Sequence, residues 1–206
     1  RDIVLIQSTP DRAPLSPLLS GIGSGGNAQV ARALDALTIN SKDAAAYLMV
    51  ASHLFARNNF KQSIDVYREA ARVVPDDLSI RLNFGRTLKS MSDYDEAEAQ
   101  YRAALRIDPK SAEAHAGLAA VRLSKGKIDE AVQGYRDALA LDSENASIHD
   151  ELAAALMKQQ AFDAAVAEYR EVTRLTPDVA RAHAALGGAL RLANRADEAI
   201  RLFRAA

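Results

Sequence analysis

The sequence predicts an all-α fold in which helix–turn–helix repeats stack on one another, and three observations carry this prediction. A pattern of apolar, small and aromatic residues returns every 34 residues, which is the signature of a stacked-repeat architecture. Each repeat contains two amphipathic segments of roughly 14 residues, about 21 Å long as helices, with a short polar turn between them. Small and aromatic residues recur at fixed offsets, where helices cross closely and where gaps between repeats need filling. One hairpin cannot bury its apolar face alone, so neighbouring repeats have to stack.

Residues 78–111 show the repeat most completely. Their marker residues are Phe84, Gly85, Leu88, Tyr94, Ala97, Tyr101, Ala104 and Pro109. The aromatic residue of the second helix returns as Tyr67, Tyr135, Tyr169 and Phe203. This pattern resembles the tetratricopeptide repeat (TPR) family, whose helix–turn–helix unit has such residues at the same offsets. The resemblance covers residues 44–206 and implies a right-handed superhelical solenoid.

The period divides the chain into three parts. Residues 1–26 are expected to form an extended Pro/Gly-rich tail and linker, and residues 27–43 a partial repeat that caps the array. Residues 44–206 are expected to form a TPR domain of five repeats, at 44–77, 78–111, 112–145, 146–179 and 180–206. The last repeat is truncated, so we expect either that the natural protein continues or that this end packs on another chain. First helices are expected near 44–57, 78–90, 112–124, 146–158 and 180–192, and second helices near 61–73, 95–107, 129–141, 163–175 and 197–206.

The tail differs from everything after it. Pro10, Pro14 and Pro17 forbid a continuous helix, and the tract at 21–26 reads as a flexible linker. This tract formally matches G-x-G-x-x-G, but no strand directly precedes it, as a dinucleotide site requires. We expect the apolar residues near Ile3–Leu19 to lie on the repeat array, in the same chain or a neighbouring one, as a peptide ligand would. A fused partner segment is the alternative.

Composition excludes several classes of function. The chain has 26 basic and 27 acidic residues, so no net charge draws it toward nucleic acid or an anionic membrane. It contains no cysteine, which excludes a disulfide framework and a thiol nucleophile. No apolar run approaches the roughly 18 residues that a membrane span needs. Both a cytoplasmic and a periplasmic location remain open.

No group of residues predicts a catalytic site, a metal site or a cofactor. His115, His149 and His183 recur at the repeat spacing, about 10 Å apart on successive repeats, too far to share a zinc ion that needs ligands at about 2 Å. They are expected to be packing residues. Asp95, Asp129, Asp163 and Asp197 recur at the start of the second helices, where they are expected to cap free N–H groups and to meet the positive end of the helix dipole. We therefore expect a protein that is not an enzyme.

A binding surface is the better candidate. The resemblance implies that the first helices line a concave face and that ligands bind along it. In this groove Asn83, Arg86 and Lys89 are expected to hold backbone or acidic groups of an extended peptide, while apolar pockets take its anchors. Only Asn83 matches the family's chaperone clamp or asparagine ladder, so neither specialisation is expected. The full set of candidate peptide-binding residues is Leu48, Ser52, Phe55, Asn83, Arg86, Lys89, Leu123, Asp150, Met157, Lys158, Arg181 and Arg191.

The function predicted from the sequence is a protein–protein interaction scaffold that binds an extended peptide, either from a partner or from its own or a neighbour's tail. One alternative is a regulatory TPR array at the N-terminal side of a larger transferase-type enzyme. Another is a bacterial envelope or pilus assembly factor. Self-association through the tail or the truncated last repeat is a further expectation.

Overall fold

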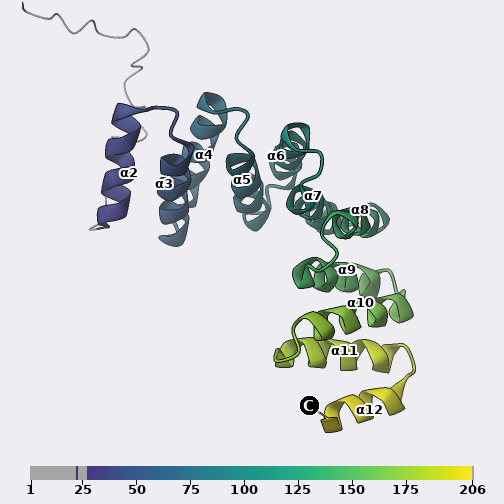
Figure 1. Ribbon diagram of the computed structural model, residues 1–206. Helices are drawn as coiled ribbons and strands as arrows, with labels where there is room; N and C mark the ends of the chain where they lie inside the picture. The colour runs from purple at the N-terminus through teal and green to yellow at the C-terminus, as the bar shows by residue number, and fades with distance from the viewer. Residues whose placement is uncertain (1–21, 23–26, 206) are drawn as a thin grey trace, which may run out of the picture. The chain divides into compact units, whose positions relative to one another are not determined.

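The computed structural model describes residue 22 and residues 27–205 (Figure 1). Every element in this part is a helix, which confirms the predicted all-α fold. The expectations for the tail, including a docked or fused segment at 3–19, lie outside the described residues, as does the side chain of Phe203. The helices are α2 (Ala28–Ile39), α3 (Ala44–Ala56), α4 (Phe60–Val73), α5 (Leu78–Ser90), α6 (Tyr94–Ile107), α7 (Ala112–Ser124), α8 (Ile128–Leu141), α9 (Ala146–Lys158), α10 (Phe162–Leu175), α11 (Ala180–Leu192) and α12 (Ala196–Ala205).

The helix bounds agree with the 34-residue pattern to within one residue. The first helix of each repeat begins at the expected residue, and each second helix begins one residue earlier than expected. The reason lies in the turn between the two helices. One residue of each turn has a left-handed backbone conformation, and a following N–H bonds back to the first helix. These left-handed residues are Asn58, Ser92, Gly126, Gln160 and Asn194, with φ between 58° and 77°.

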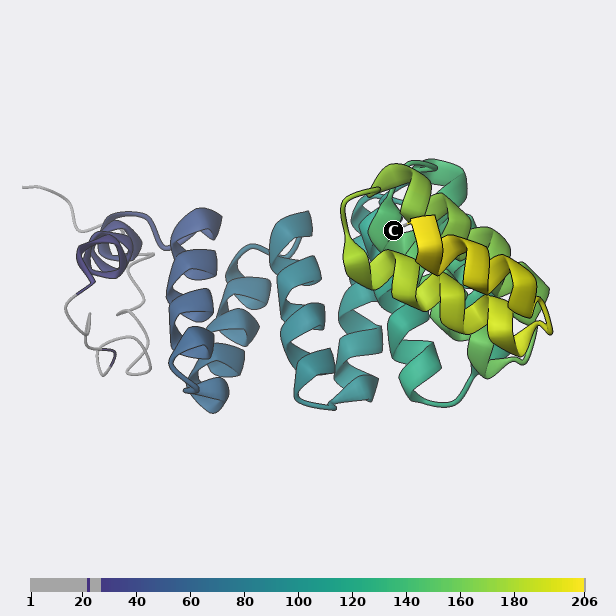
Figure 2. The same ribbon diagram turned by 90° about the horizontal axis from the view of Figure 1, so that it is seen from below.

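The chain divides into two compact units, residues 1–87 and residues 88–206, and the division falls inside α5. In unit 1, α2 packs on α3 and α3 on α4 (Figures 1 and 2). Val30, Val50 and Val66, one from each helix, are at most 1% exposed. Tyr67 stacks on Phe84 with 5.6 Å between ring centroids. Both rings therefore fill the gap between successive helix pairs, as the repeat pattern predicts.

In unit 2 each helix from α6 to α12 packs on the next one. The small residues expected at helix crossings are buried there: Ala97, Ala131 and Ala165 have no exposed surface. At Gly134, an added Cβ would lie only 3.0 Å from the Cβ of Ala119. Helix α7 also contacts α9 directly, so these two successive first helices lie side by side.

The recurring histidines have a structural role, but they act through hydrogen bonds as well as packing. Nε2 of His115 lies 3.0 Å from the carbonyl oxygen of Pro109, and Nε2 of His183 lies 2.8 Å from that of Pro177. A carbonyl oxygen can only accept, so Nε2 is the donor. His149 repeats this bond and also places Nδ1 2.7 Å from Glu168. The ring thus ties the first helix to the loop before it. Among the described residues, no three His, Cys, Asp or Glu side chains form a group that could hold a metal ion.

Of the two roles predicted for the recurring aspartates, the capping role is wrong, whereas their place at the positive end of the helix dipole is confirmed. Asp95, Asp129 and Asp163 are each the second residue of their helix, so they lie in the first turn and not at the N-cap. The N-cap of α6 is Asp93, and the N-caps of α8 and α10 make no side-chain bond to the helix. Asp197 likewise lies in the first turn of α12.

Three of these aspartates reach across to the next repeat instead. Asp95 pairs with Lys125 at 2.8 Å, and Asp129 accepts a hydrogen bond from Gln159 at 2.6 Å. Both partners follow the first helix of the next repeat, 30 residues further on. At the following junction Ala193 occupies the equivalent position, and Asp163 pairs instead with Arg195 at 3.5 Å. A hollow of about 400 Å³ remains there, lined by Gln160–Ala164 and Leu192–Asn194.

Lys125 also makes the stability of unit 2 depend on pH. Its Nζ donates a hydrogen bond of 2.8 Å to Glu98, whose side chain is 7% exposed. This bond lowers the pKa of Glu98 below its usual value, and Arg102 adds to the effect. A carboxyl group with a lowered pKa in the folded state stabilises the fold above its unfolded pKa of about 4.3, and this contribution is lost as the pH falls through the folded value. We therefore expect the urea concentration at the midpoint of unfolding to decrease as the pH is lowered below about 4.5.

The variant Lys125→Met should have a lower urea midpoint at pH 7 than the wild type. Its midpoint should also decrease less steeply as the pH is lowered. Lys110→Met, at an exposed position, is the matched control and should keep the wild-type pH profile. Equal acid-side slopes for the wild type and Lys125→Met would contradict this assignment.

Candidate peptide-binding surfaces

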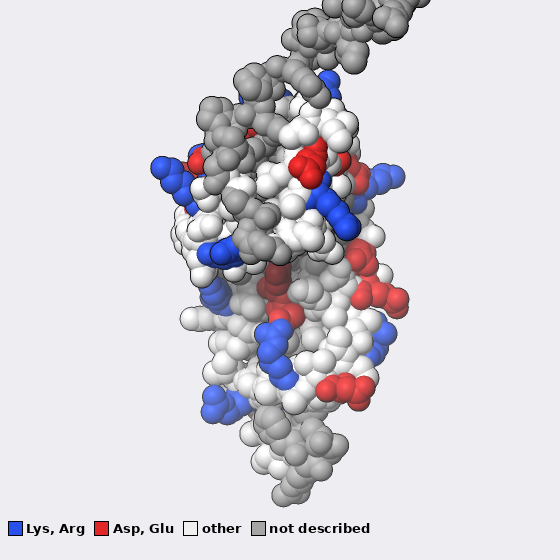
Figure 3. Space-filling model, turned by 90° about the vertical axis from the view of Figure 1, so that its left-hand side faces the viewer, with Lys and Arg blue, Asp and Glu red and all other residues white. Residues whose placement is uncertain are grey.

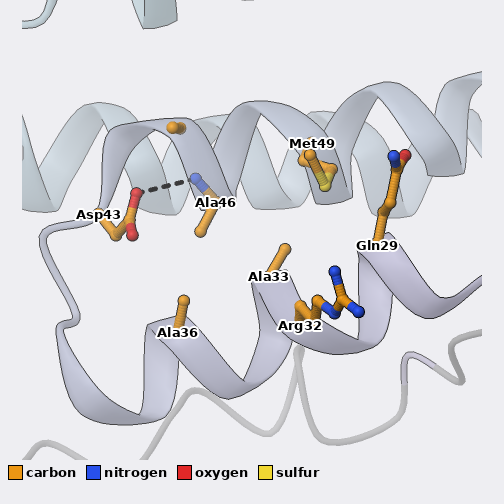
Figure 4. Close-up of a pocket in the computed structure, with 8 residues that line it drawn as sticks. Gln29, Arg32, Ala33, Ala36, Asp43, Ala46 and Met49 are labelled. Carbon is orange, nitrogen blue, oxygen red and sulfur yellow. Dashed lines mark hydrogen bonds between the residues drawn. The ribbon is translucent and has the colours of Figure 1, made fainter.

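A hollow of about 310 Å³ lies between α2 and α3 in unit 1 (Figure 4). Alanines from both helices face one another across it and supply half of its lining. Met49 of α3 is 42% exposed at this surface. An open space of this size and apolar character can take one large apolar side chain. The lining residues are Gln29, Arg32, Ala33, Ala36, Asp43, Ala45, Ala46 and Met49.

The two charged residues of this α2–α3 hollow lie toward its opposite ends (Figure 4). Asp43 is already engaged, since its Oδ1 accepts a hydrogen bond of 3.0 Å from the N–H of Ala46 and so caps α3. Arg32 is exposed on α2, close to Gln29 and Met49. The hollow therefore combines an apolar floor with a guanidinium group at one end. On the face shown in Figure 3, charged side chains of both signs are interspersed.

None of the candidate residues predicted from the sequence lines this hollow. Ala45 and Met49 do lie on the first helix of the first full repeat, whose inner face the family resemblance assigns to ligands. The segment at 27–43 is predicted to be a cap, and a cap is not expected to form one wall of a site. The available signal was the pair Ala33 and Ala36, two small residues on one side of α2.

The predicted site residues of unit 1 and α5 differ in availability. Ser52 is exposed, while Leu48 and Phe55 are half-buried. The Phe55 ring packs edge-on against Phe60 at 5.1 Å, which gives it a structural role. Asn83 donates to the carbonyl oxygen of Ser79 at 2.8 Å, and Arg86 bonds to Asn83 at 3.3 Å.

Unit 2 holds the remaining predicted residues. Leu123 and Met157 pack against the core, so they are partly structural. Asp150 of α9 pairs with Arg181 of α11 at 2.7 Å, which joins two successive first helices. Lys158 and Arg191 are exposed, and Lys89 is half-buried. The structure therefore brings Asp150 and Arg181 together and leaves Lys158 and Arg191 open to solvent.

Second-helix tyrosines reach the sixth residue of the next first helix. An added Cβ at Gly117 would lie 2.2 Å from the Tyr101 ring, so this ring occupies the place of a side chain there. One repeat further, the Tyr135 hydroxyl interacts with the carboxyl group of Glu151. Burial raises the pKa of Glu151, and the charge of Lys89 partly opposes this effect. Glu151 was not among the predicted site residues.

Models of the tetratricopeptide repeat match residues 82–146 and residues 122–188, which together span more than half of the chain. The chain belongs to the tetratricopeptide repeat family. Membership agrees with the helix pairs, the left-handed turn residues and the buried aromatic positions. No curated protein matches the TPR chain.

Solved structures of TPR proteins share the fold. MamA of Desulfovibrio magneticus RS-1 is 19% identical with a TM-score of 0.68, over 78% of this chain and 91% of MamA. YrrB, described as a TPR protein with an unusual peptide-binding site, is 19% identical with a TM-score of 0.63, over 82% and 88%. PilW, described as a widely conserved type IV pilus biogenesis factor, is 20% identical with a TM-score of 0.75, over 84% and 80%.

Identities near 20% establish a common fold and do not transfer a ligand. In the described part, every helix is too short or too polar to cross a membrane.

Proposed function

We propose that this TPR chain is a non-enzymatic scaffold that binds an extended peptide along its first helices, with an apolar anchor side chain in the α2–α3 hollow. The observation that carries this proposal is the hollow itself. It is open, floored by alanines, and bordered by the exposed Met49. Rigid helices already hold its walls in place, so most of the ordering cost of binding falls on the peptide.

The charges at the hollow favour one kind of peptide. Arg32 places a guanidinium at one end, whereas the carboxylate of Asp43 at the other end is used to cap α3. A guanidinium binds a carboxylate through two parallel hydrogen bonds. The preferred ligand is therefore an extended segment with a large apolar residue next to an acidic one.

The test starts from peptides selected from a random displayed library on the wild-type chain. Ala45→Trp should fill the hollow and weaken binding of a selected peptide by roughly tenfold or more, which corresponds to about 1.4 kcal/mol. Ala140→Trp is the matched control, because Ala140 is exposed on the second helix α8. Fluorescence anisotropy with labelled peptide measures both. Unchanged affinity in Ala45→Trp would remove the hollow from the proposal.

The ligand of the hollow could also be the chain's own N-terminal segment. Ile22, just before α2, is 7% exposed, but it does not line the hollow, so this second candidate stays a prediction from the sequence. A chain that begins at residue 27 should then bind a selected peptide more tightly than the full chain. Equal affinities would show that the segment does not compete for the hollow.

The alternatives of a larger transferase-type enzyme and of a pilus or envelope assembly factor stay predictions. PilW is described as a pilus biogenesis factor, and it supports the assembly-factor alternative only through the fold that it shares with this chain. Both are compatible with a scaffold that binds peptides.

A further inference from the structure

The sixth residue of α9, Glu151, is unusual for a side chain on the first-helix side of unit 2. It is half-buried, and burial is the main reason why its pKa is raised. The described residues provide no ion pair for it: Lys89 acts on its charge without pairing with it. Its neighbour Asp150 is already paired with Arg181 at 2.7 Å. Glu151 is thus a partly desolvated carboxyl group without a counterion of its own.

The repeat pattern explains why this carboxyl group stays accessible. The equivalent positions in the repeats before and after are Gly117 and Ala185. Gly117 has no side chain, and the Tyr101 ring fills that place from the neighbouring second helix. Ala185 carries a single methyl group. No long side chain at this position of a neighbouring repeat is therefore available to cover or neutralise Glu151.

The tyrosine behind Glu151 positions it. Tyr135 is 1% exposed, and its hydroxyl interacts with the Glu151 carboxyl group. A hydroxyl group on a buried ring gives the carboxyl group a polar neighbour in a fixed place. The remaining lone pairs of the carboxyl group are available to a ligand.

We propose that Glu151 and Tyr135 form a subsite for a basic side chain, arginine or lysine, of a peptide that lies along α7 and α9. This subsite rests on the proposed peptide-binding function and adds a charge preference to it. A guanidinium supplies the planar pair of donors that matches a carboxylate. Pairing in a partly desolvated place gains more than the same contact at the open surface. The charge preference is the opposite of the one expected at Arg32.

The test uses small probes that imitate the side chain alone. n-Butylguanidinium is titrated into the isotope-labelled full chain, and n-butylurea serves as its neutral isostere. Backbone amide signals of α9 report binding by NMR. We expect n-butylguanidinium to give saturable shifts around residue 151, with a Kd on the order of 10 mM, and n-butylurea to give none.

Two variants decide the assignment. Glu151→Gln should abolish the saturable shifts, whereas Glu144→Gln, at an exposed loop residue, should retain them. Thermal unfolding of each variant confirms that it is folded. Equal shifts with both probes, or shifts that persist in Glu151→Gln, would overturn the subsite. If Ala45→Trp still weakens a selected peptide in that case, the proposed function stands and only the subsite fails.

Discussion

Replacing Tyr101 with alanine is expected to lower the free energy of unfolding by about 3–5 kcal/mol, as large-to-small changes of buried aromatic residues do. Tyr101 is 3% exposed, and its ring lies where a side chain of residue 117 would otherwise be. Its loss leaves a cavity between α6 and α7 that Gly117 cannot fill. Urea unfolding followed by circular dichroism measures the change.

Tyr94→Ala is the control for this experiment. Tyr94 is half-buried at the start of α6, and its hydroxyl lies 3.3 Å from Ser92 in the turn. We expect a clearly smaller loss there than at Tyr101. A loss below about 1 kcal/mol for Tyr101→Ala would refute its place in the core, because cavity formation alone costs more.

Two glycine-to-alanine changes should have opposite signs. In a helix interior, alanine is better than glycine by about 1 kcal/mol. Gly188 in α11 has open space around an added Cβ, so Gly188→Ala should stabilise the fold by about 0.5–1 kcal/mol. At Gly117 the Cβ would lie 2.2 Å from the buried Tyr101 ring, so Gly117→Ala should destabilise the fold by about 1–3 kcal/mol.

A double-mutant cycle shows whether the ring causes the loss. With Tyr101→Ala already present, Gly117→Ala should become neutral or stabilising, because the added methyl group then meets a cavity. The free energies of unfolding of the two single variants and the double variant give the coupling. Additive effects would mean that Gly117 and Tyr101 do not contact each other in solution.

Most of the fold could be predicted because each of the five repeats has the same type of residue at the same buried positions. Tyr67, Tyr101 and Tyr135 recur at one offset and are each at most 3% exposed. The left-handed turn residue is also periodic, but the residue type at that position does not predict its backbone conformation. Glycine, which tolerates this conformation best, occurs there only at Gly126.

Contacts between repeats could not be predicted in the same way. The partner of Asp95 is Lys125, 30 residues away, and a carboxylate near a helix start is equally compatible with a cap. The choice depends on which side chains the stacking brings within reach. For the same reason the α2–α3 hollow and the Tyr135–Glu151 pair could not be predicted, because each is formed by residues of two neighbouring helices.

The most direct test of the central claim is to locate a bound peptide by photo-crosslinking. A selected peptide carrying benzoylphenylalanine at its apolar anchor is irradiated with the full TPR chain, and mass spectrometry identifies the attached residues. The account predicts crosslinks to α2 and α3, concentrated between residues 29 and 49, and their loss in Ala45→Trp. Crosslinks concentrated on the second helices α8 and α10 would contradict it.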